Sequence, residues 1–249
     1  MKKTLFIVLL ALIAAAPAMA ASLSVTSAAA MGNGAAVNQC SGDSQPGPCG
    51  LEVTNDGTTQ KAFVRDETPT DETVYRSTFY FDPNDINTAG TAFPVGGAMT
   101  LFRARNDAFD GAFQVMMTRT SNRGIRVWVR SLSNNGNPKF TRRMDLGCDD
   151  PGCVVAAITL PARIQAEWTQ GDTCGAASGT STITLFDGND AQVDTSELVD
   201  QSNNPVGINN CNRDVDVVEL GLVAIFSNTI PNGNSMYFDE FESFRTLAP

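Results

Sequence analysis

The sequence contains no histidine among its 249 residues. This absence excludes a Ser-His-Asp or Cys-His nucleophile system, and it excludes any histidine-ligated zinc or iron site. Lysine is also scarce: after residue 20 the chain has only two lysines, Lys61 and Lys139, but 13 arginines. Arginine favours planar, bidentate contacts wherever positive charge has a specific role. Any catalysis must therefore use carboxylates, tyrosine, arginine or calcium.

Long hydrophobic runs are also absent, apart from one near the start of the chain at residues 5–16. Lys2 and Lys3 precede this run, and Pro17 and an Ala-Met-Ala ending follow it, which is the pattern of a secretory signal peptide. The run is shorter than the roughly 20 residues that a membrane-spanning helix needs. We expect residues 1–20 to be cleaved and the protein to be exported, periplasmic or extracellular, without membrane insertion.

The chain that follows this signal carries 15 basic and 27 acidic residues, a net charge of −12. Such a chain should not bind nucleic acid or an anionic membrane through bulk charge. It shows no repeat, coiled coil or clear linker. We predict a small, polar N-terminal segment at residues 21–49, with a short strand and a disulfide loop, and one sandwich domain at residues 50–249. The oligomeric state stays open.

Six cysteines lie in the exported part of the chain. Export makes them candidates for disulfides, and zinc would need paired C-x-x-C spacing or histidines, which the chain lacks. Fifteen pairings are possible, and proximity in the sequence favours three of them. The predicted disulfides are Cys40 with Cys49, Cys148 with Cys153, and Cys174 with Cys211.

Short segments of alternating apolar residues, rich in Val, Ile, Thr, Phe and Tyr, recur from residue 50 onward, with turn sequences such as NDG and NNGN between them. This pattern predicts an all-β, antiparallel sandwich of about twelve strands. The segment at 215–226 has enough apolar residues for a helix, but its β-branched content favours a strand. The candidate strands lie at 50–56, 61–66, 73–81, 98–106, 112–120, 124–132, 139–146, 153–160, 163–170, 181–188, 215–226 and 235–245.

Four of these segments, GLEVTNDG, VYRSTFYFDPND, RIQAEWTQ with STITLFDGNDAQV, and MYFDEFESFR, resemble the laminin-G-like, concanavalin A-like jelly rolls of secreted bacterial proteins. In those domains the last strand carries an aromatic-acid-acid run and returns to the sheet centre beside the first strand. The resemblance implies a two-sheet jelly roll, often with a structural calcium ion. Such folds host lectins, glycosidases, lyases and structural modules, so the resemblance does not select a function.

The arginine-rich stretch between Arg103 and Arg143 suggests a binding face. In GIRVWVRSL, strand alternation places Arg126, Trp128 and Arg130 on the face opposite the core. If neighbouring strands add their outward residues, an aromatic platform and guanidinium groups would suit an acidic glycan. The alternative is that these arginines pair with the many acids and cover the tryptophan. The candidate ligand-binding residues are Trp128, Arg126, Arg130, Arg103, Arg105 and Tyr80.

The last predicted strand, residues 235–245, has acids and aromatics in an order that no single strand face explains. We expect Tyr237, Phe241 and Ser243 to face the core, and Glu240 and Glu242 to face either solvent or the arginine-bearing sheet.

Asp239 in the same strand would then be buried, unless a bulge after Phe238 turns it outward. A buried Asp239 would need backbone amides, an arginine or a calcium ion, so this residue is the predicted site of a possible structural calcium. Loops RNDAFDG, FDGNDAQVD and CNRDVD also offer oxygen ligands for calcium. No other cofactor is expected.

Catalysis would most simply use Glu240 and Glu242 as the two carboxylates of a glycosidase. The E-x-D-x-x-E run of concanavalin A-like glycosidases and the Gln-x-His strand of jelly-roll alginate lyases are both missing. Our first interpretation is therefore an exported non-catalytic module that binds carbohydrate or a cell-surface polymer, or serves a structural role at a surface. The alternative is a polysaccharide-degrading enzyme, a hydrolase or a lyase, that uses carboxylate or tyrosine chemistry without histidine.

Overall fold

The computed structural model describes residues 20–22, 37–39, 51–54, 62–67, 69–84, 95–108, 110–148, 152–225 and 235–245. Within these ranges no helix is long and apolar enough to cross a membrane. The strands of the described chain are β1 (Ala20–Ser22), β2 (Val37–Gln39), β3 (Leu51–Thr54), β4 (Ala62–Asp66), β5 (Val74–Asp82), β6 (Ala98–Arg105), β7 (Gly111–Thr120), β8 (Gly124–Leu132), β9 (Pro138–Thr141), β10 (Met144–Gly147), β11 (Ala162–Thr169), β12 (Thr180–Phe186), β13 (Gln192–Val199), β14 (Val217–Ile225) and β15 (Ser235–Arg245).

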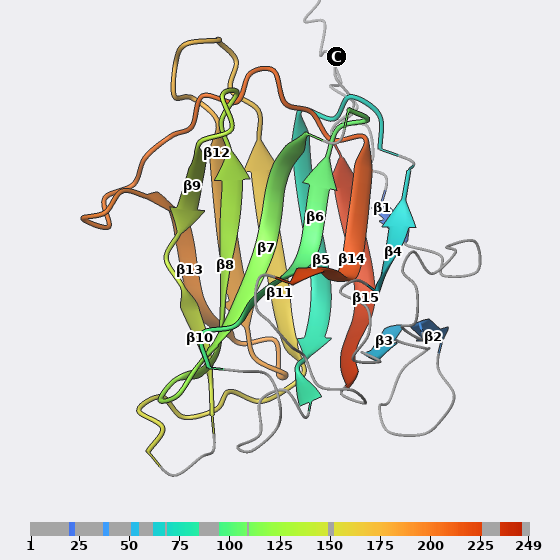
Figure 1. Cartoon of the computed structure of the whole chain (residues 1–249), viewed down its shortest axis with the longest axis vertical. Coiled ribbons are helices and arrows are strands. Elements are labelled where there is room, and N and C mark those ends of the chain that lie inside the picture. The colour runs from blue at the N-terminus through green and yellow to red at the C-terminus, as the bar shows by residue number, and fades with distance from the viewer. Residues whose placement is uncertain are drawn as a thin grey trace, which may run out of the picture.

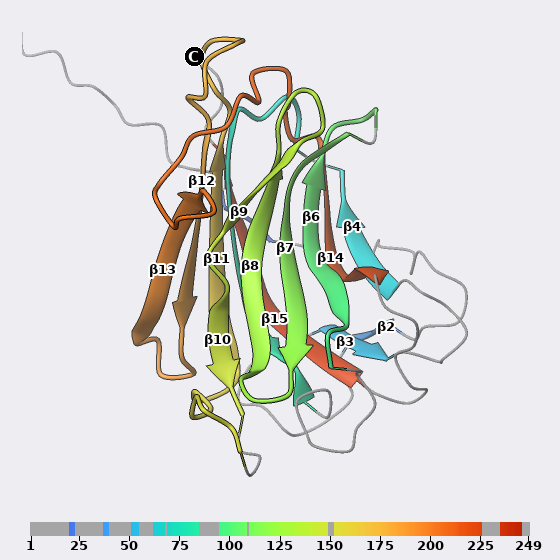
Figure 2. The same cartoon turned by 60° about the vertical axis from the view of Figure 1, so that its left-hand side comes forward.

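These strands form an antiparallel jelly-roll sandwich of two layers (Figures 1 and 2). Sheet A has the order β2-β3-β15-β5-β11-β12-β13, and sheet B has the order β9-β8-β7-β6-β14-β4. Strand β13 joins them, because most of its length pairs with β12 while Leu198 and Val199 pair with β9. Strand β1 adds to β15, and β10 adds to β8. The predicted all-β antiparallel fold is confirmed.

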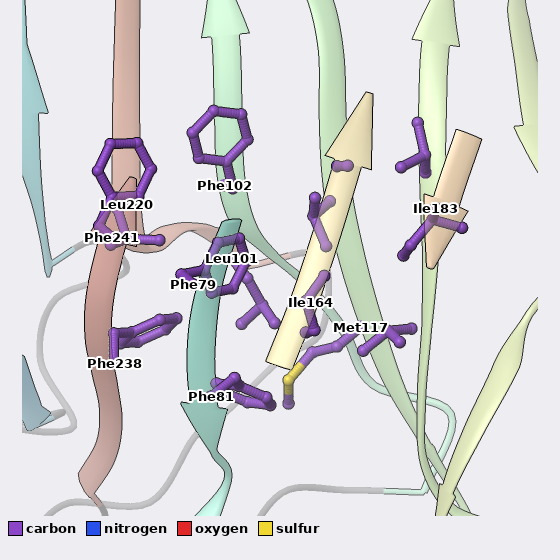
Figure 3. Packing of buried hydrophobic residues seen from close by; sticks show 14 of the residues in the cluster. Phe79, Phe81, Leu101, Phe102, Met117, Ile164, Ile183, Leu220, Phe238 and Phe241 are labelled. Atoms are coloured by element: carbon purple, nitrogen blue, oxygen red, sulfur yellow. The ribbon is translucent and has the colours of Figure 1, made fainter. Parts of the chain in front are cut away.

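The core lies between the two sheets and is rich in aromatic rings (Figure 3). Every second side chain of a strand points to the same face, so the long strands each send one row of apolar residues inward. Phe102 and Phe113 of sheet B contact rings of sheet A, including Phe241 at 6.0 Å and Trp168 at 6.1 Å between centroids. Aromatic side chains bury much apolar area each, so these contacts hold the layers together.

Ten of the twelve predicted strand segments agree with an observed strand to within two residues at each end. The segment at 153–160 is not a strand. Val154 is 63% exposed, and among the described residues the segment bonds to β10 and the residue after it through two separate backbone bonds, from Cys148 N to Val155 O and from Ile158 N to Leu146 O. The backbone turns at Gly147, which has a φ of +77°. A Cβ atom there would lie 2.0 Å from Ala156 O, so only glycine allows this close approach. Apolar residues without a pairing partner do not make a strand.

Two other differences concern strand number. The predicted strand at 139–146 is split into β9 and β10, because Arg142 and Arg143 leave the ladder between them. Strand β13 was not predicted: its Val193 is 45% exposed, so the strand lacks the strict alternation that marked the others.

Two of the predicted disulfides are present, Cys148–Cys153 and Cys174–Cys211. The predicted pair Cys40–Cys49 lies outside the described residues, as do residues 1–19 of the predicted signal peptide. Strands β1 and β2 carry the start of the chain onto strands β15 and β3 of the sandwich. The predicted division at residue 50 stays a prediction.

Strand β15 contains a β-bulge that explains its mixed pattern. The register with β5 shifts between Asp239 and Glu242, and Glu240 has a φ of +47°. Before the bulge Phe238 is buried, and after it Phe241 and Ser243 are buried, so the inward face changes from even to odd positions. The expected inward position of Tyr237 is wrong: its side chain is on the outer face and is 40% exposed. Asp239 is turned outward, as the bulge predicts.

Candidate functional site

The outer faces of the two sheets are the regions where chemistry-bearing side chains gather. We call the outward residues of sheet B the B face and those of sheet A the A face. The B face consists of Arg65, Arg103, Arg105, Gln114, Met116, Thr118, Arg126, Trp128, Arg130, Phe140 and Glu219. The A face consists of Arg76, Thr78, Tyr80, Arg163, Gln165, Glu167, Thr182, Thr184, Phe186, Thr195, Glu197, Tyr237, Asp239, Glu242 and Phe244.

On the B face one carboxylate holds three arginines. Glu219 of β14 has no solvent exposure. Its Oε1 accepts a bond from Arg65 Nη2 at 3.0 Å, and its Oε2 accepts one from Arg103 Nε at 2.7 Å. Arg105 Nη2 approaches Oε1 at 3.4 Å. The three guanidinium groups supply the counter-charge that a buried carboxylate needs, because an unpaired buried charge would be very costly.

Arg105 is the most buried of the three arginines, and its charge loses the most contact with water. Its side chain is almost entirely buried. Burial lowers the pKa of Arg105, Glu219 raises it, and the nearby Arg65 and Arg103 lower it further. Because one carboxylate faces three guanidinium groups, the cluster retains an excess of positive charge.

Arg130 of β8 extends this positive charge across the face. Its Nη1 donates to the amide oxygen of Gln114 at 3.2 Å, and no carboxylate of the described residues lies within ion-pairing distance of it. Burial alone lowers the pKa of Arg130. Arg130 is therefore a partly desolvated cation with a neutral partner.

Trp128 lies on the B face as predicted, but it is not an open platform. It is 6% exposed, and the guanidinium carbon of Arg143 lies 4.8 Å from its ring centroid. The neighbouring Arg126 pairs with Asp145 through Nε and Oδ1 at 2.7 Å. For these two residues the structure matches the alternative in which arginines cover the tryptophan and pair with acids.

Tyr80 is on the opposite side of the molecule from Trp128. It belongs to β5, which lies between β15 and β11 in sheet A, so the predicted binding residues divide into five on the B face and one on the A face. The strand of Tyr80 was expected to lie beside the arginine-bearing strands, and this expectation is wrong. The pairing of β5 with strands distant in sequence could not be inferred from local alternation.

On the A face Tyr80 is part of a different cluster, formed with Asp190 and Arg163. The Tyr80 hydroxyl donates to Asp190 Oδ1 at 2.8 Å, and Arg163 Nε donates to the same oxygen at 2.7 Å. Tyr80 and Arg163 are cross-strand neighbours, and Asp190 reaches them from the β12–β13 turn.

The turn that carries Asp190 is fixed from several directions. Asp187 Oδ1 accepts the amides of Asn189 and Ala191, and the Gly188 amide donates to Thr159 O at 2.7 Å. Asp190 itself has a φ of +60°, a conformation that aspartate tolerates better than most residues. The carboxylate is thus held over the sheet by its backbone.

The A-face cluster pushes two pKa values apart. Burial and the hydrogen bond to Asp190 raise the pKa of Tyr80, with the Asp190 charge adding to the effect. The hydrogen bonds from Arg163 and Tyr80 lower the pKa of Asp190. At neutral pH the tyrosine is therefore protonated and the aspartate is ionised.

The predicted catalytic pair Glu240 and Glu242 is exposed on β15, with Glu242 opposite Thr78 of β5. The two residues do not alternate along a regular strand, because the bulge lies between them. Asp239 Oδ1 accepts the Glu240 amide at 2.8 Å. The calcium ion expected at Asp239 stays a prediction.

Three other carboxylates meet where the sheets end. Ligand oxygens of Asp71, Asp214 and Asp216 lie within 4.8 Å of one another. Burial raises the pKa of Asp214, and the charges of Asp216 and Asp71 raise it further. Asp216 already accepts the backbone amides of Asp71 and Asp107, at 2.6 and 3.0 Å. Two of the three loops singled out for calcium thus approach each other, but three carboxylates fall short of the six to eight oxygens that calcium takes.

Two adjoining hollows lie beside the β8–β9 hairpin, with volumes of about 710 and 500 Å³. Both are lined by Pro138 and Lys139, and the second also by the exposed Phe140. Asn134 and Asn209 in the larger hollow bond to each other at 3.0 Å, so their amides mainly hold the turn.

Sequence interpretation missed Asp190, Arg163 and Glu219. Glu219 is the one acid in a long apolar strand, which is a usable signal for a buried charge. Asp190 stands in a turn sequence, DGND, where aspartate is common for conformational reasons.

Known protein families and curated proteins give no match to this sequence. Among solved structures, the chain is similar to alginate lyase vAL-1 from Chlorella virus, with a TM-score of 0.42 and 10% identity over 86% of this chain and 89% of the other. Alginate lyase AlyC3 matches with a TM-score of 0.43 and 10% identity over 78% and 74%. The botulinum neurotoxin serotype G binding domain structure matches with a TM-score of 0.43 and 13% identity over 90% of this chain and 45% of the other.

These comparisons correct the first interpretation of the sequence. The expectation of a non-catalytic module finds no support among them, since the matched structures include several alginate lyases. The alternative, a polysaccharide-degrading enzyme, takes its place as the hypothesis.

Proposed function

We propose that this protein is a polysaccharide-degrading enzyme whose site lies on the A face at Tyr80, Asp190 and Arg163. The observation that carries the proposal is the geometry of the cluster, in which Asp190 Oδ1 accepts hydrogen bonds from the Tyr80 hydroxyl at 2.8 Å and from Arg163 Nε at 2.7 Å. The side chains of Tyr80 and Asp190 reach solvent on a sheet face that offers further hydroxyl and amide groups.

The chemistry follows from the protonation states of Tyr80 and Asp190. Tyr80 is the proton donor to the glycosidic oxygen as the bond between that oxygen and the sugar carbon breaks. Asp190 is an ionised carboxylate that stabilises positive charge developing on the sugar, and Arg163 positions it. Glu242 on the neighbouring strand is the base that takes a proton from the attacking water, whose oxygen bonds to the sugar carbon.

Hydrolysis of a neutral polysaccharide fits the A face better than elimination from an acidic one. Glu167, Glu197, Asp239, Glu242 and the turn residue Asp190 outnumber the arginines of this face. A polyanionic chain would meet repulsion here, and elimination requires an acidic sugar.

The test is release of reducing ends from a panel of neutral and acidic polysaccharides. Tyr80→Phe and Asp190→Asn should each lower kcat about 100-fold, the range for loss of a proton donor or its partner. Glu197→Gln, which removes a carboxylate elsewhere on the same face, should keep full activity. Full activity in Tyr80→Phe, or no cleavage of any neutral polysaccharide by the natural protein, would overturn the proposal. Unsaturated products from an acidic polysaccharide would replace hydrolysis by elimination.

The proposal includes two finer assignments. Membership of the laminin-G-like, concanavalin A-like jelly rolls is supported by the place of β15 beside β3 and β5 in sheet A. Export is supported by the two disulfides, since disulfides persist mainly in oxidising compartments. N-terminal sequencing of the exported protein should find Ala21 as the first residue.

A further inference from the structure

The B face carries a row of paired residues that crosses six strands. Cross-strand pairing places Arg65, Glu219, Arg103, Gln114, Arg130 and Phe140 in one line. Neighbouring strands are about 4.8 Å apart, so the Cα atoms of Arg103 and Arg130 are about 10 Å apart, with Gln114 between them. Long guanidinium side chains from these two positions can reach one group placed above Gln114.

The polar hydrogens in this part of the row exceed their acceptors. Arg103 uses Nε and Nη2 on Glu219, and its Nη1 has no acceptor on the described residues. Arg130 uses only Nη1, on the Gln114 oxygen. The amide nitrogen of Gln114 likewise has no acceptor within the described chain. Arg103, Gln114 and Arg130, on three adjacent strands, thus each keep an unused donor.

The charges of the row also favour the binding of an anion. Three arginines, Arg65, Arg103 and Arg105, pair with the buried carboxylate of Glu219. Among the described residues Arg130 has no carboxylate partner, and the exposed Glu67 pairs with Arg65. The chain as a whole is strongly acidic, so a local excess of positive charge on it is the exception. A partly desolvated cation such as Arg130 binds an anion more strongly than one in water, because the local dielectric is lower.

The row ends in an open aromatic ring. Phe140 is directly opposite Arg130 and is 42% exposed, whereas Trp128 is covered. An aromatic face beside an anion site suits a sugar ring that bears the anion.

We propose that the B face binds an anionic polysaccharide, with a carboxylate or sulfate group held between Arg103 and Arg130 over the amide of Gln114, and a sugar ring against Phe140. This site is separate from the A-face cluster and its occupancy requires no catalysis. Arginine forks suit both carboxylate and sulfate, because each offers paired oxygens to two N–H groups.

The test is affinity electrophoresis and calorimetry with a polyuronate, a sulfated polysaccharide and a neutral glucan. Binding to the polyuronate, the sulfated polymer or both, weakened by salt, is the expected result, and the comparison identifies the anion. Arg130→Gln should raise Kd about tenfold, the effect of one charge-assisted hydrogen bond. Arg76→Gln, which removes the same charge from the A face, should leave Kd unchanged.

A second variant separates binding from folding. Gln114→Glu keeps the shape of the side chain but supplies the missing carboxylate from within, so it should abolish binding while the melting temperature stays the same or rises. Tight binding in both Arg130→Gln and Gln114→Glu, equal binding of the neutral glucan, or no binding of either anionic polymer would overturn the inference. Activity plays no part in these readouts, so their failure is distinct from failure of the proposed hydrolysis.

Discussion

The A face and the B face are built by the same strand alternation, yet they use charge in opposite ways. On the B face the carboxylate is buried and the arginines around it outnumber it. On the A face the charged groups are accessible, and the carboxylate of Asp190 is held at the surface by one arginine and one tyrosine. The B face therefore holds its charges in a buried network with an excess of positive charge, whereas the A face keeps its charged groups in contact with solvent.

Replacing the buried carboxylate should have the largest effect on stability. Glu219→Gln leaves Arg65, Arg103 and Arg105 facing one another without a counter-charge, so the free energy of unfolding should fall by about 3–5 kcal/mol. Urea denaturation measures it. Glu67→Gln, at a carboxylate that is 66% exposed, should change stability by less than about 0.5 kcal/mol. Equal effects in the two variants would remove the distinction between buried and surface pairing.

The bulge on the A face offers a matched pair of glycine substitutions. Glu240 has a positive φ, where glycine is relaxed, so Glu240→Gly should be neutral or stabilise the fold by up to about 1 kcal/mol. Glu242→Gly, in the regular part of the same strand, should destabilise it by about 0.5–1 kcal/mol. Thermal denaturation of both variants compares them, and a loss of stability in Glu240→Gly as large as in Glu242→Gly would contradict the assigned geometry.

The carboxylate cluster of Asp71, Asp214 and Asp216 is a third arrangement of charge, in which carboxylates lie beside other carboxylates instead of beside arginines. The pKa of Asp214 in the folded state is above its ordinary value of 3.8. The stabilisation from this group is therefore complete below that value and is lost as the pH rises through the folded-state pKa. Asp214→Asn should be more stable than the natural protein at neutral pH and should show a flatter pH dependence. Asp172→Asn, at an exposed site, is the control, and the same pH profile in both variants would contradict the expectation.

The smallest expected effect concerns the salt bridge of the A face. Because the pKa of Asp190 is lowered, its contribution to stability is present above the ordinary value of 3.8 and is lost as the pH falls through the folded-state pKa. Arg163→Gln should raise the pKa of Asp190 in an NMR titration, with less than about 1 kcal/mol of stability lost, since the pair is exposed. Arg76→Gln should leave that titration unchanged.

Local alternation predicted most strands and the proximity of cysteines predicted two disulfides, because both depend on neighbours in the sequence. Strand order depends on distant pairing, and for this reason Tyr80 was assigned to the wrong neighbourhood. The B-face arginines were found because their strand alternates strictly. The Tyr80, Asp190 and Arg163 cluster was not, because it joins two strands and a turn that are separated by up to 110 residues.

The bulge in β15 also affects which changes in the gene this protein can tolerate. Loss of one codon at Asp239 or Glu240 would restore an uninterrupted two-residue repeat. Phe238 and Phe241 would then lie two positions apart, so Phe241 and Ser243 would still face the core and Glu242 would still face outward. Loss of one codon elsewhere in the strand would turn the residues on one side of it to the wrong face, so a deletion at the bulge should be the mildest one-codon deletion in this strand.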